Sequence, residues 1–245
     1  MAINWFKYSA PSTFYALAGK LAPWFAAAAA ILFGVGLYLG LYVAPTDAVQ
    51  HDAYRIIYIH VPTSVLSMFL YLVMAGYAAL GLIFNTRMSA MMANALAPTG
   101  ALFAFIALWT GAFWGRPTWG TYWVFDARLT SELILFFLYL GFIALHASID
   151  DPRRADRASA LLAIVGSVNV PIIYFSVYWW NTLHQGITIN PGGEVKMDPA
   201  MQKALYTMFL ACWAYAIAMT LWRVRSIILE RERTTQWVQD LAETK

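Results

Sequence analysis

The chain alternates between long apolar stretches and short polar connectors. Six stretches are apolar over roughly 20 residues, the length that an α-helix needs to cross about 30 Å of hydrocarbon. The first is too long, and too weakly preceded by basic residues, for a cleaved signal peptide. We therefore predict a single membrane domain over 1–245, with a charged helical extension at 223–245. The predicted spans are 23–44, 61–84, 91–113, 130–148, 158–179 and 204–222.

Composition supports this interpretation and excludes several classes of protein. Hydrophobic residues make up 61% of the chain, charged residues only 12%, and the mean hydropathy is +0.58. Soluble domains average about 45–50% apolar and about 25% charged residues. We expect an all-α membrane protein, a bundle of six transmembrane helices in the lipid bilayer. The net charge of +3 comes without a Lys/Arg cluster, so we expect no nucleic-acid partner.

The distribution of basic residues orients the bundle. If both termini are cytoplasmic, the inner segments hold eleven of the sixteen Lys and Arg residues, and the outer segments hold Arg55, Arg116, Arg128, Lys196 and Lys203. Basic residues gather on the cytoplasmic side of membrane proteins. The connectors at 45–60, 114–130 and 180–203 are therefore predicted to face outward.

Several motifs are missing. The chain has no G-x-x-x-x-G-K-[ST] sequence, so it is not expected to bind ATP through a P-loop. No predicted span carries an ionisable residue near its centre, as ion-coupled carriers usually do. Cys212 is the single cysteine and is interpreted as a packing residue. No C-x-x-C-H motif for covalent haem attachment occurs.

The segment 113–132, FWGRPTWGTYWVFDARLTSE, concentrates six aromatic residues within thirteen positions. Interfacial aromatic belts are common in membrane proteins, but they need only one or two rings per helix end. An outward apolar patch of this density is more typical of a ligand or partner surface. Gly115, Pro117 and Gly120 favour a turn followed by a short surface helix over one continuous helix.

Two histidines flank this aromatic segment at the same predicted membrane depth. His60 precedes Val61-Pro62 at the mouth of the second span, and His184 follows the fifth span. Each alone is compatible with an ordinary interfacial side chain. Together with the flat apolar surface they fit a haem site, because neutral imidazole is a common axial ligand of haem iron. His51 and His146 are left as ordinary side chains.

The sequence W-G-R-P-T-W-G-T-Y-W-V-F-D-A-R-L-T at 114–130 resembles the tryptophan-rich "WWD" signature of haem-handling membrane proteins. With His60, His184, six spans and this length, essentially the whole chain resembles the CcmC family, the haem exporter protein C family of cytochrome c maturation. Tyr122 and Phe125 stand where tryptophan is frequent; both keep a flat ring, but each lacks an indole N–H.

The resemblance implies a function, a location and partners. Such proteins bind haem b at the periplasmic face of the bacterial inner membrane, through two axial histidines and the WWD loop. They present it to the periplasmic haem chaperone CcmE, beside the small protein CcmD and the ABC-type components CcmA and CcmB. An ATPase on another chain is consistent with the missing P-loop. Whether the chain catalyses haem attachment to the chaperone or only positions it stays open.

We assign the following roles on this basis. His60 and His184 are the expected axial ligands of the iron. Arg128, and with less support Arg55 and Arg116, are expected to pair with haem propionates. Asp126 is expected either to hold the loop by pairing with Arg128 or to contact the chaperone. The apolar shelf for the porphyrin is expected to consist of Trp114, Trp119, Tyr122, Trp123 and Phe125.

Two other classes of function remain open from the residues alone. The chain could be a small-molecule permease, although the lack of polar residues at mid-depth favours a surface site. It could also be a scaffold that recruits partners through its aromatic loop and carries no haem. Absorption of the purified protein distinguishes the scaffold from a haem protein, because a scaffold would be colourless.

Overall fold

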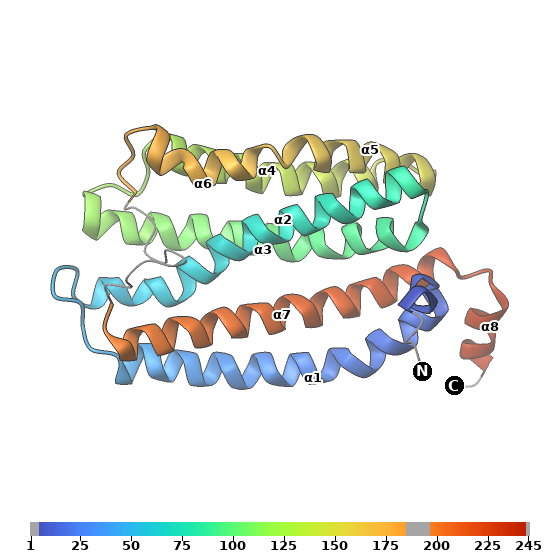
Figure 1. Cartoon of the computed structure of the whole chain (residues 1–245), viewed down its shortest axis with the longest axis horizontal. Helices are drawn as coiled ribbons and strands as arrows, with labels where there is room; N and C mark the ends of the chain where they lie inside the picture. The colour runs from blue at the N-terminus through green and yellow to red at the C-terminus, as the bar shows by residue number, and fades with distance from the viewer. Residues whose placement is uncertain (1–4, 185–196, 244–245) are drawn as a thin grey trace.

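The computed structural model describes residues 5–184 and 197–243, and this part of the chain is helical without a β-strand. Lys196 and Lys245, used above to orient the bundle, lie outside the described residues. Figure 1 shows the long helices running side by side along the longest axis. The α-helices are α1 (Pro11–Tyr38), α2 (Ile57–Phe84), α3 (Arg87–Trp119), α4 (Ala127–Ala147), α5 (Pro152–Gly166), α6 (Asn169–Trp179), α7 (Pro199–Arg231) and α8 (Gln236–Glu243).

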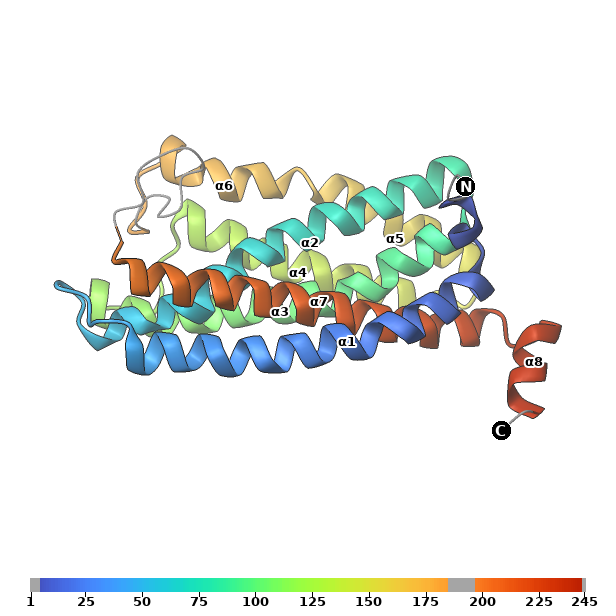
Figure 2. The same cartoon turned by 60° about the horizontal axis from the view of Figure 1, so that its bottom comes forward.

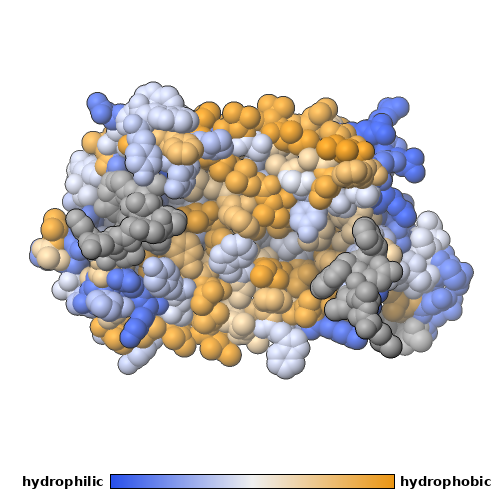
Figure 3. Space-filling view, viewed as in Figure 1, coloured by the Kyte–Doolittle hydropathy of each residue, from blue (hydrophilic) through white to orange (hydrophobic). Residues whose placement is uncertain are grey.

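Among the residues that the structure describes, six helical segments are long and apolar enough to cross a membrane, which confirms the predicted all-α membrane fold. They are Pro11–Val43, Asp52–Phe84, Arg87–Trp119, Ala127–Ala147, Pro152–Trp179 and Pro199–Arg231. Figure 3 shows orange apolar side chains over the middle of the visible face and blue hydrophilic ones toward its ends. This pattern is expected of a bundle whose flank contacts lipid.

The helices are held together by apolar packing and by close approach at small residues. α1 packs along α7, and α2 along α3, as Figures 1 and 2 both show. The central core lies among α2, α3, α4, α5, α6 and α7. At Gly100 of α3 an added Cβ would lie 2.1 Å from the Tyr139 ring of α4, so only glycine fits there. Small residues permit such close contacts between membrane helices.

Several boundaries differ from those expected. α3 does not end near residue 113 but continues to Trp119, so the turn comes at Gly120, whose φ is +78°. The expected short surface helix is not present, because residues 120–126 between this turn and α4 are not helical. The fifth span is divided between α5 and α6 at Ser167-Val168. Pro171 carries no N–H and cannot continue the helical hydrogen bonds there. The C-terminal extension is also divided, since α7 ends at Arg231 and α8 is a separate helix.

The connectors gather at two opposite ends of the bundle. One end holds the α1–α2 connector with its 3-10 turn Asp52–Ile56, the α3–α4 connector, and the C-terminal end of α6. The other end holds the α2–α3 turn, the α4–α5 turn and α8 (Figure 2). The aromatic segment and both flanking histidines therefore lie at one end.

Candidate functional site

His60 lies in the first turn of α2 with only 9% of its surface exposed. Its Nδ1 atom is 3.0 Å from Oγ1 of Thr110 on α3. That hydroxyl group donates its single proton to the carbonyl oxygen of Ile106, 2.6 Å away. It therefore accepts a hydrogen bond from Nδ1–H of His60, which assigns the tautomer. The lone pair of Nε2 is left available for a metal ion.

His184 faces His60 from the segment that follows α6. The two imidazole centroids are 6.4 Å apart and the ring planes are inclined by 35°. Two imidazoles that share one metal ion through bonds of about 2 Å have centroids roughly 6 Å apart. The observed separation thus matches the span of two axial ligands on a single iron.

Two small cavities of about 40 and 90 Å³ adjoin this pair of rings, and both are lined by His60, Gly111, Trp119 and His184. Trp123 and Arg128 line the smaller cavity, and Trp114 the larger. Ligand pockets usually measure about 300–1,000 Å³. A macrocycle therefore does not fit inside either cavity as it stands; to hold one, the aromatic surface would have to be open at its edge or to widen.

Of the five aromatic residues expected to support a porphyrin, three line the cavities and two do not. Trp119 is 6.4 Å from the His184 ring, and Trp114 meets His60 edge-on at 5.5 Å. Trp114 is fixed by its Nε1–H, which donates to Oε1 of Gln50 at 2.6 Å. Tyr122 and Phe125 do not line either cavity, and Phe125 is 84% exposed.

Asp126 holds the connector in a way that differs from the expected ion pair. Oδ1 accepts a hydrogen bond from Leu129 N at 2.8 Å and caps α4. Oδ2 accepts from Leu183 N at 3.1 Å, next to His184 in the chain. Within the described ranges Asp126 forms no ion pair with Arg128, whose Nη1 donates instead to Ile173 O at 2.7 Å. Asp126 thus ties the two connectors of the site together.

Arg55 and Arg116 donate hydrogen bonds to backbone carbonyl groups around the site. Arg55 pairs with Asp52 at 2.9 Å and donates to the carbonyl oxygens of Gly40 and Ala44 at 2.6 and 3.2 Å. Arg116 donates to the carbonyl oxygen of Gly120, where α3 ends. Neither side chain lines either cavity, whereas Arg128 lines the smaller one.

Sequence reasoning overlooked three residues that shape the site, namely Thr110, Gly111 and Gln50. A Cβ on Gly111 would lie 3.0 Å from Cε1 of His60, so this glycine makes room for the imidazole. Thr110 and Trp114 are four residues apart, which places them on one helix face. That spacing was the available signal, but it required α3 to extend past residue 113.

Comparison with known proteins gives the family. The family model described as "Heme exporter protein C" (CcmC) matches residues 4–239. The chain belongs to the haem exporter protein C family.

Relatives with this name match over most of their length. "Heme exporter protein C" of Escherichia coli (strain K12) is 46% identical over 231 residues, covering 94% of this chain and 93% of that protein. The protein of the same name from Haemophilus influenzae is 44% identical over 237 residues, covering 97% and 96%. A "Putative cytochrome c biosynthesis ccmC-like mitochondrial protein" of Marchantia polymorpha is 41% identical over 198 residues, covering 81% and 84%.

Proposed function

We propose that this chain binds haem for export during cytochrome c maturation, with the iron held between His60 and His184. The observation that carries the proposal is the 6.4 Å separation of the two imidazoles. It is supported by the hydrogen bond from Nδ1–H of His60 to Thr110, which leaves the lone pair on Nε2 of His60 for the iron. The names of the family and of its relatives are in agreement with haem as the cargo.

The residues around the imidazoles suit a porphyrin. The two cavities lie beside the histidine pair, so the edges of a macrocycle between the rings would extend into them. Trp119 and Trp123 offer apolar contact area there, and Arg128 is the cation best placed for a propionate. Asp126 keeps the His184 segment near α4, so its role is positioning. The cargo is expected to be haem b, since no C-x-x-C-H sequence occurs for covalent attachment.

The site is proposed to face the periplasm of the bacterial inner membrane, with both termini in the cytoplasm. The bias of basic residues toward the opposite end of the bundle supports this orientation. Haem would then pass from the site to the periplasmic chaperone CcmE. CcmD and the ABC-type components CcmA and CcmB are the expected partners, and the missing P-loop agrees with an energy source on another chain.

Visible absorption of the purified full-length chain tests the iron ligands. We expect a bis-histidine Soret band in the wild type, and a shifted, weaker band in His60→Gly and His184→Gly. Added imidazole should restore the band in each variant, because free imidazole can take the place of the missing ligand but cannot repair a misfolded protein. His51→Asn is a suitable control, since His51 is exposed and has a φ of 51°, which asparagine tolerates.

An unchanged Soret band in the double variant would refute the ligand assignment. A colourless wild-type protein that still associates with the other components would favour a scaffold instead. Reconstitution with a haem-free CcmE then tests the transfer step, which requires loss of haem from this chain and its gain by the chaperone.

A further inference from the structure

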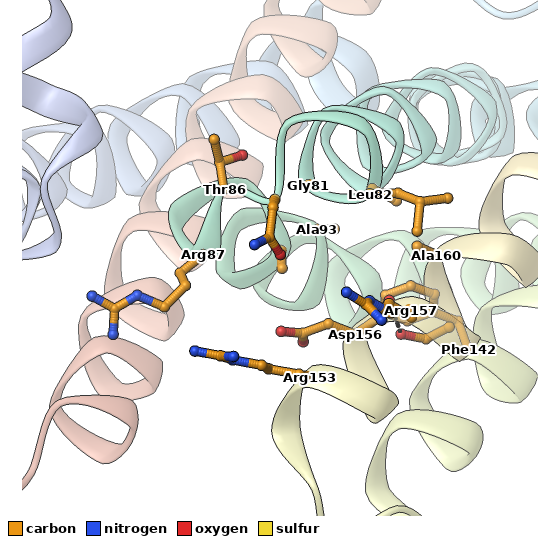
Figure 4. A pocket seen from close by; sticks show the side chains of 14 residues that line it. Gly81, Leu82, Thr86, Arg87, Ala93, Phe142, Arg153, Asp156, Arg157 and Ala160 are labelled. Carbon is orange, nitrogen blue, oxygen red and sulfur yellow. Dashed lines mark hydrogen bonds between the residues drawn. The ribbon is translucent and has the colours of Figure 1, made fainter.

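Another cavity, of about 270 Å³, lies at the opposite end of the bundle, between the α2–α3 turn and the start of α5. Arg87 of α3 and Arg153 and Arg157 of α5 line this cavity. In Figure 4 the guanidinium group of Arg87 points away from those of Arg153 and Arg157. None of these residues belongs to the histidine site. From this pocket we infer a binding site for the anionic phosphate headgroup of a phospholipid.

The charges in and behind the cavity are unbalanced in favour of an anion. Asp156 lines it, but Arg231 already pairs with this carboxylate at 2.7 Å, and His146 lies 3.1 Å from it. Arg87, which lines the cavity, pairs with Glu232, which does not, at 3.3 Å. Arg153 and Arg157 have no acidic partner among the residues described. Two guanidinium groups are therefore available for an incoming phosphate.

The backbone adds to this preference. α3 begins at the cavity, and the side chain of its N-cap residue Thr86 accepts no hydrogen bond from a backbone N–H of the first turn; its hydroxyl group donates to Oγ of Ser89 at 2.8 Å. Unsatisfied N–H groups at a helix N-terminus and the helix dipole both attract anions. Arg87 and Ala90 of this first turn line the cavity.

The surroundings distinguish an amphiphile from a soluble anion. The inner wall is apolar and includes Leu82, Ala93 and Phe142. One and two turns beyond Arg157 on the same face of α5, Leu161 and Val165 are 57% and 70% exposed. An anion at Arg157 thus has an apolar track leading from it along the lipid-facing side of α5. Basic pockets at the ends of membrane helices bind acidic lipid headgroups.

Lipid binding to the purified full-length chain in neutral detergent tests the inference. Native mass spectrometry and thermal shift are measured with short-chain phosphatidylglycerol, with phosphatidylcholine and with inorganic phosphate. We expect phosphatidylglycerol to bind and stabilise the wild type, and Arg153→Gln/Arg157→Gln to weaken binding about tenfold or more. Arg154→Gln is the matched control, because Arg154 is exposed on the same turn and does not line the cavity.

The conservative pair Arg153→Lys/Arg157→Lys keeps the charge and should retain most of the binding. Equal binding by the glutamine pair and the wild type would overturn the site, as would an equal loss in Arg154→Gln. Equal affinity for phosphatidylcholine would overturn the preference for an anionic lipid. Stabilisation by inorganic phosphate as large as that by lipid would overturn the lipid assignment. None of these measurements needs haem, so they stand apart from the proposed function.

Discussion

The hydroxyl group of Thr110 accepts a hydrogen bond from Nδ1 of His60 at 3.0 Å while donating its own proton to Ile106. This pair joins α3 to the first turn of α2 and sets the tautomer of the imidazole. Metal-binding histidines usually carry such a partner on the nitrogen that faces away from the metal. Thr110 lines neither cavity, so a substitution there tests the haem proposal without removing a contact to haem.

Replacing Thr110 with valine should lower haem affinity by about 10–100-fold, the usual effect of removing such a partner. Valine fills about the same volume but removes the hydroxyl group that accepts the hydrogen bond from Nδ1–H. Thr110→Ser keeps the hydroxyl group and should bind nearly as well as the wild type. Haem titration followed by absorption measures both. Full affinity in the valine variant would mean that the hydrogen bond does not orient a ligand.

Gly111→Ala should also disturb the site, through sterics. Its new Cβ would lie 3.0 Å from Cε1 of His60, so the imidazole would have to shift by a few tenths of an ångström. We expect a shifted Soret band and severalfold weaker binding. Gly76→Ala is the control, since nothing lies within 4 Å of a Cβ there. Identical spectra for the two variants would contradict the close fit around His60.

Asp126→Ala should weaken haem binding by more than its effect on stability explains. It removes a helix cap, which costs about 1 kcal/mol, and also the tie to Leu183 beside His184. Asp151→Ala removes the cap of α5 without any contact to the histidine site. Thermal unfolding should fall similarly in both, whereas haem affinity should fall only in Asp126→Ala. A parallel fall of affinity in both variants would argue against positioning by Asp126.

The aromatic residues should separate into two groups. Trp119→Leu and Trp123→Leu remove rings that line the cavities and should weaken haem binding. Phe125→Leu changes a ring that lies outside them and should leave affinity unchanged. Haem titration of the three variants, each with the same replacement, checks this division. Comparable losses at all three positions would mean that the loop closes over the ligand.

The sequence predicted six apolar helices and placed His60 and His184 at the same end of the bundle, because hydropathy and membrane depth are local properties. It did not predict that α3 continues to Trp119, since Gly115 and Pro117 are usual signals for the end of a helix. In the structure the connector folds back over Gly115, where a Cβ would lie 3.0 Å from the carbonyl oxygen of Thr121. That contact brings two separate parts of the segment together, and no local pattern records it.

The candidate propionate partners show the same limit. The sequence favoured Arg128 over Arg55 and Arg116 as a propionate partner, but it did not predict what the other two side chains contact. The structure distinguishes them by position, since Arg128 lines a cavity beside the histidines, whereas Arg55 lies outside both cavities and donates to the carbonyl oxygen of Gly40. Such bonds depend on how α1 meets α2, which follows from tertiary packing. Thr110 was overlooked for a related reason, because its importance depends on contact between two helices.

Because α3 extends to Trp119, His60 is contacted by a long helix, whereas His184 lies in a connector. Thr110, Gly111, Trp114 and Trp119 belong to one continuous helix of 33 residues, and the first three brace His60 from it. His184 instead sits in a connector that is fastened to α4 through the neighbouring Leu183. A long helix shifts as one unit, whereas a connector can move by itself, so if haem binds between the two histidines we expect its bond to His184 to break before its bond to His60.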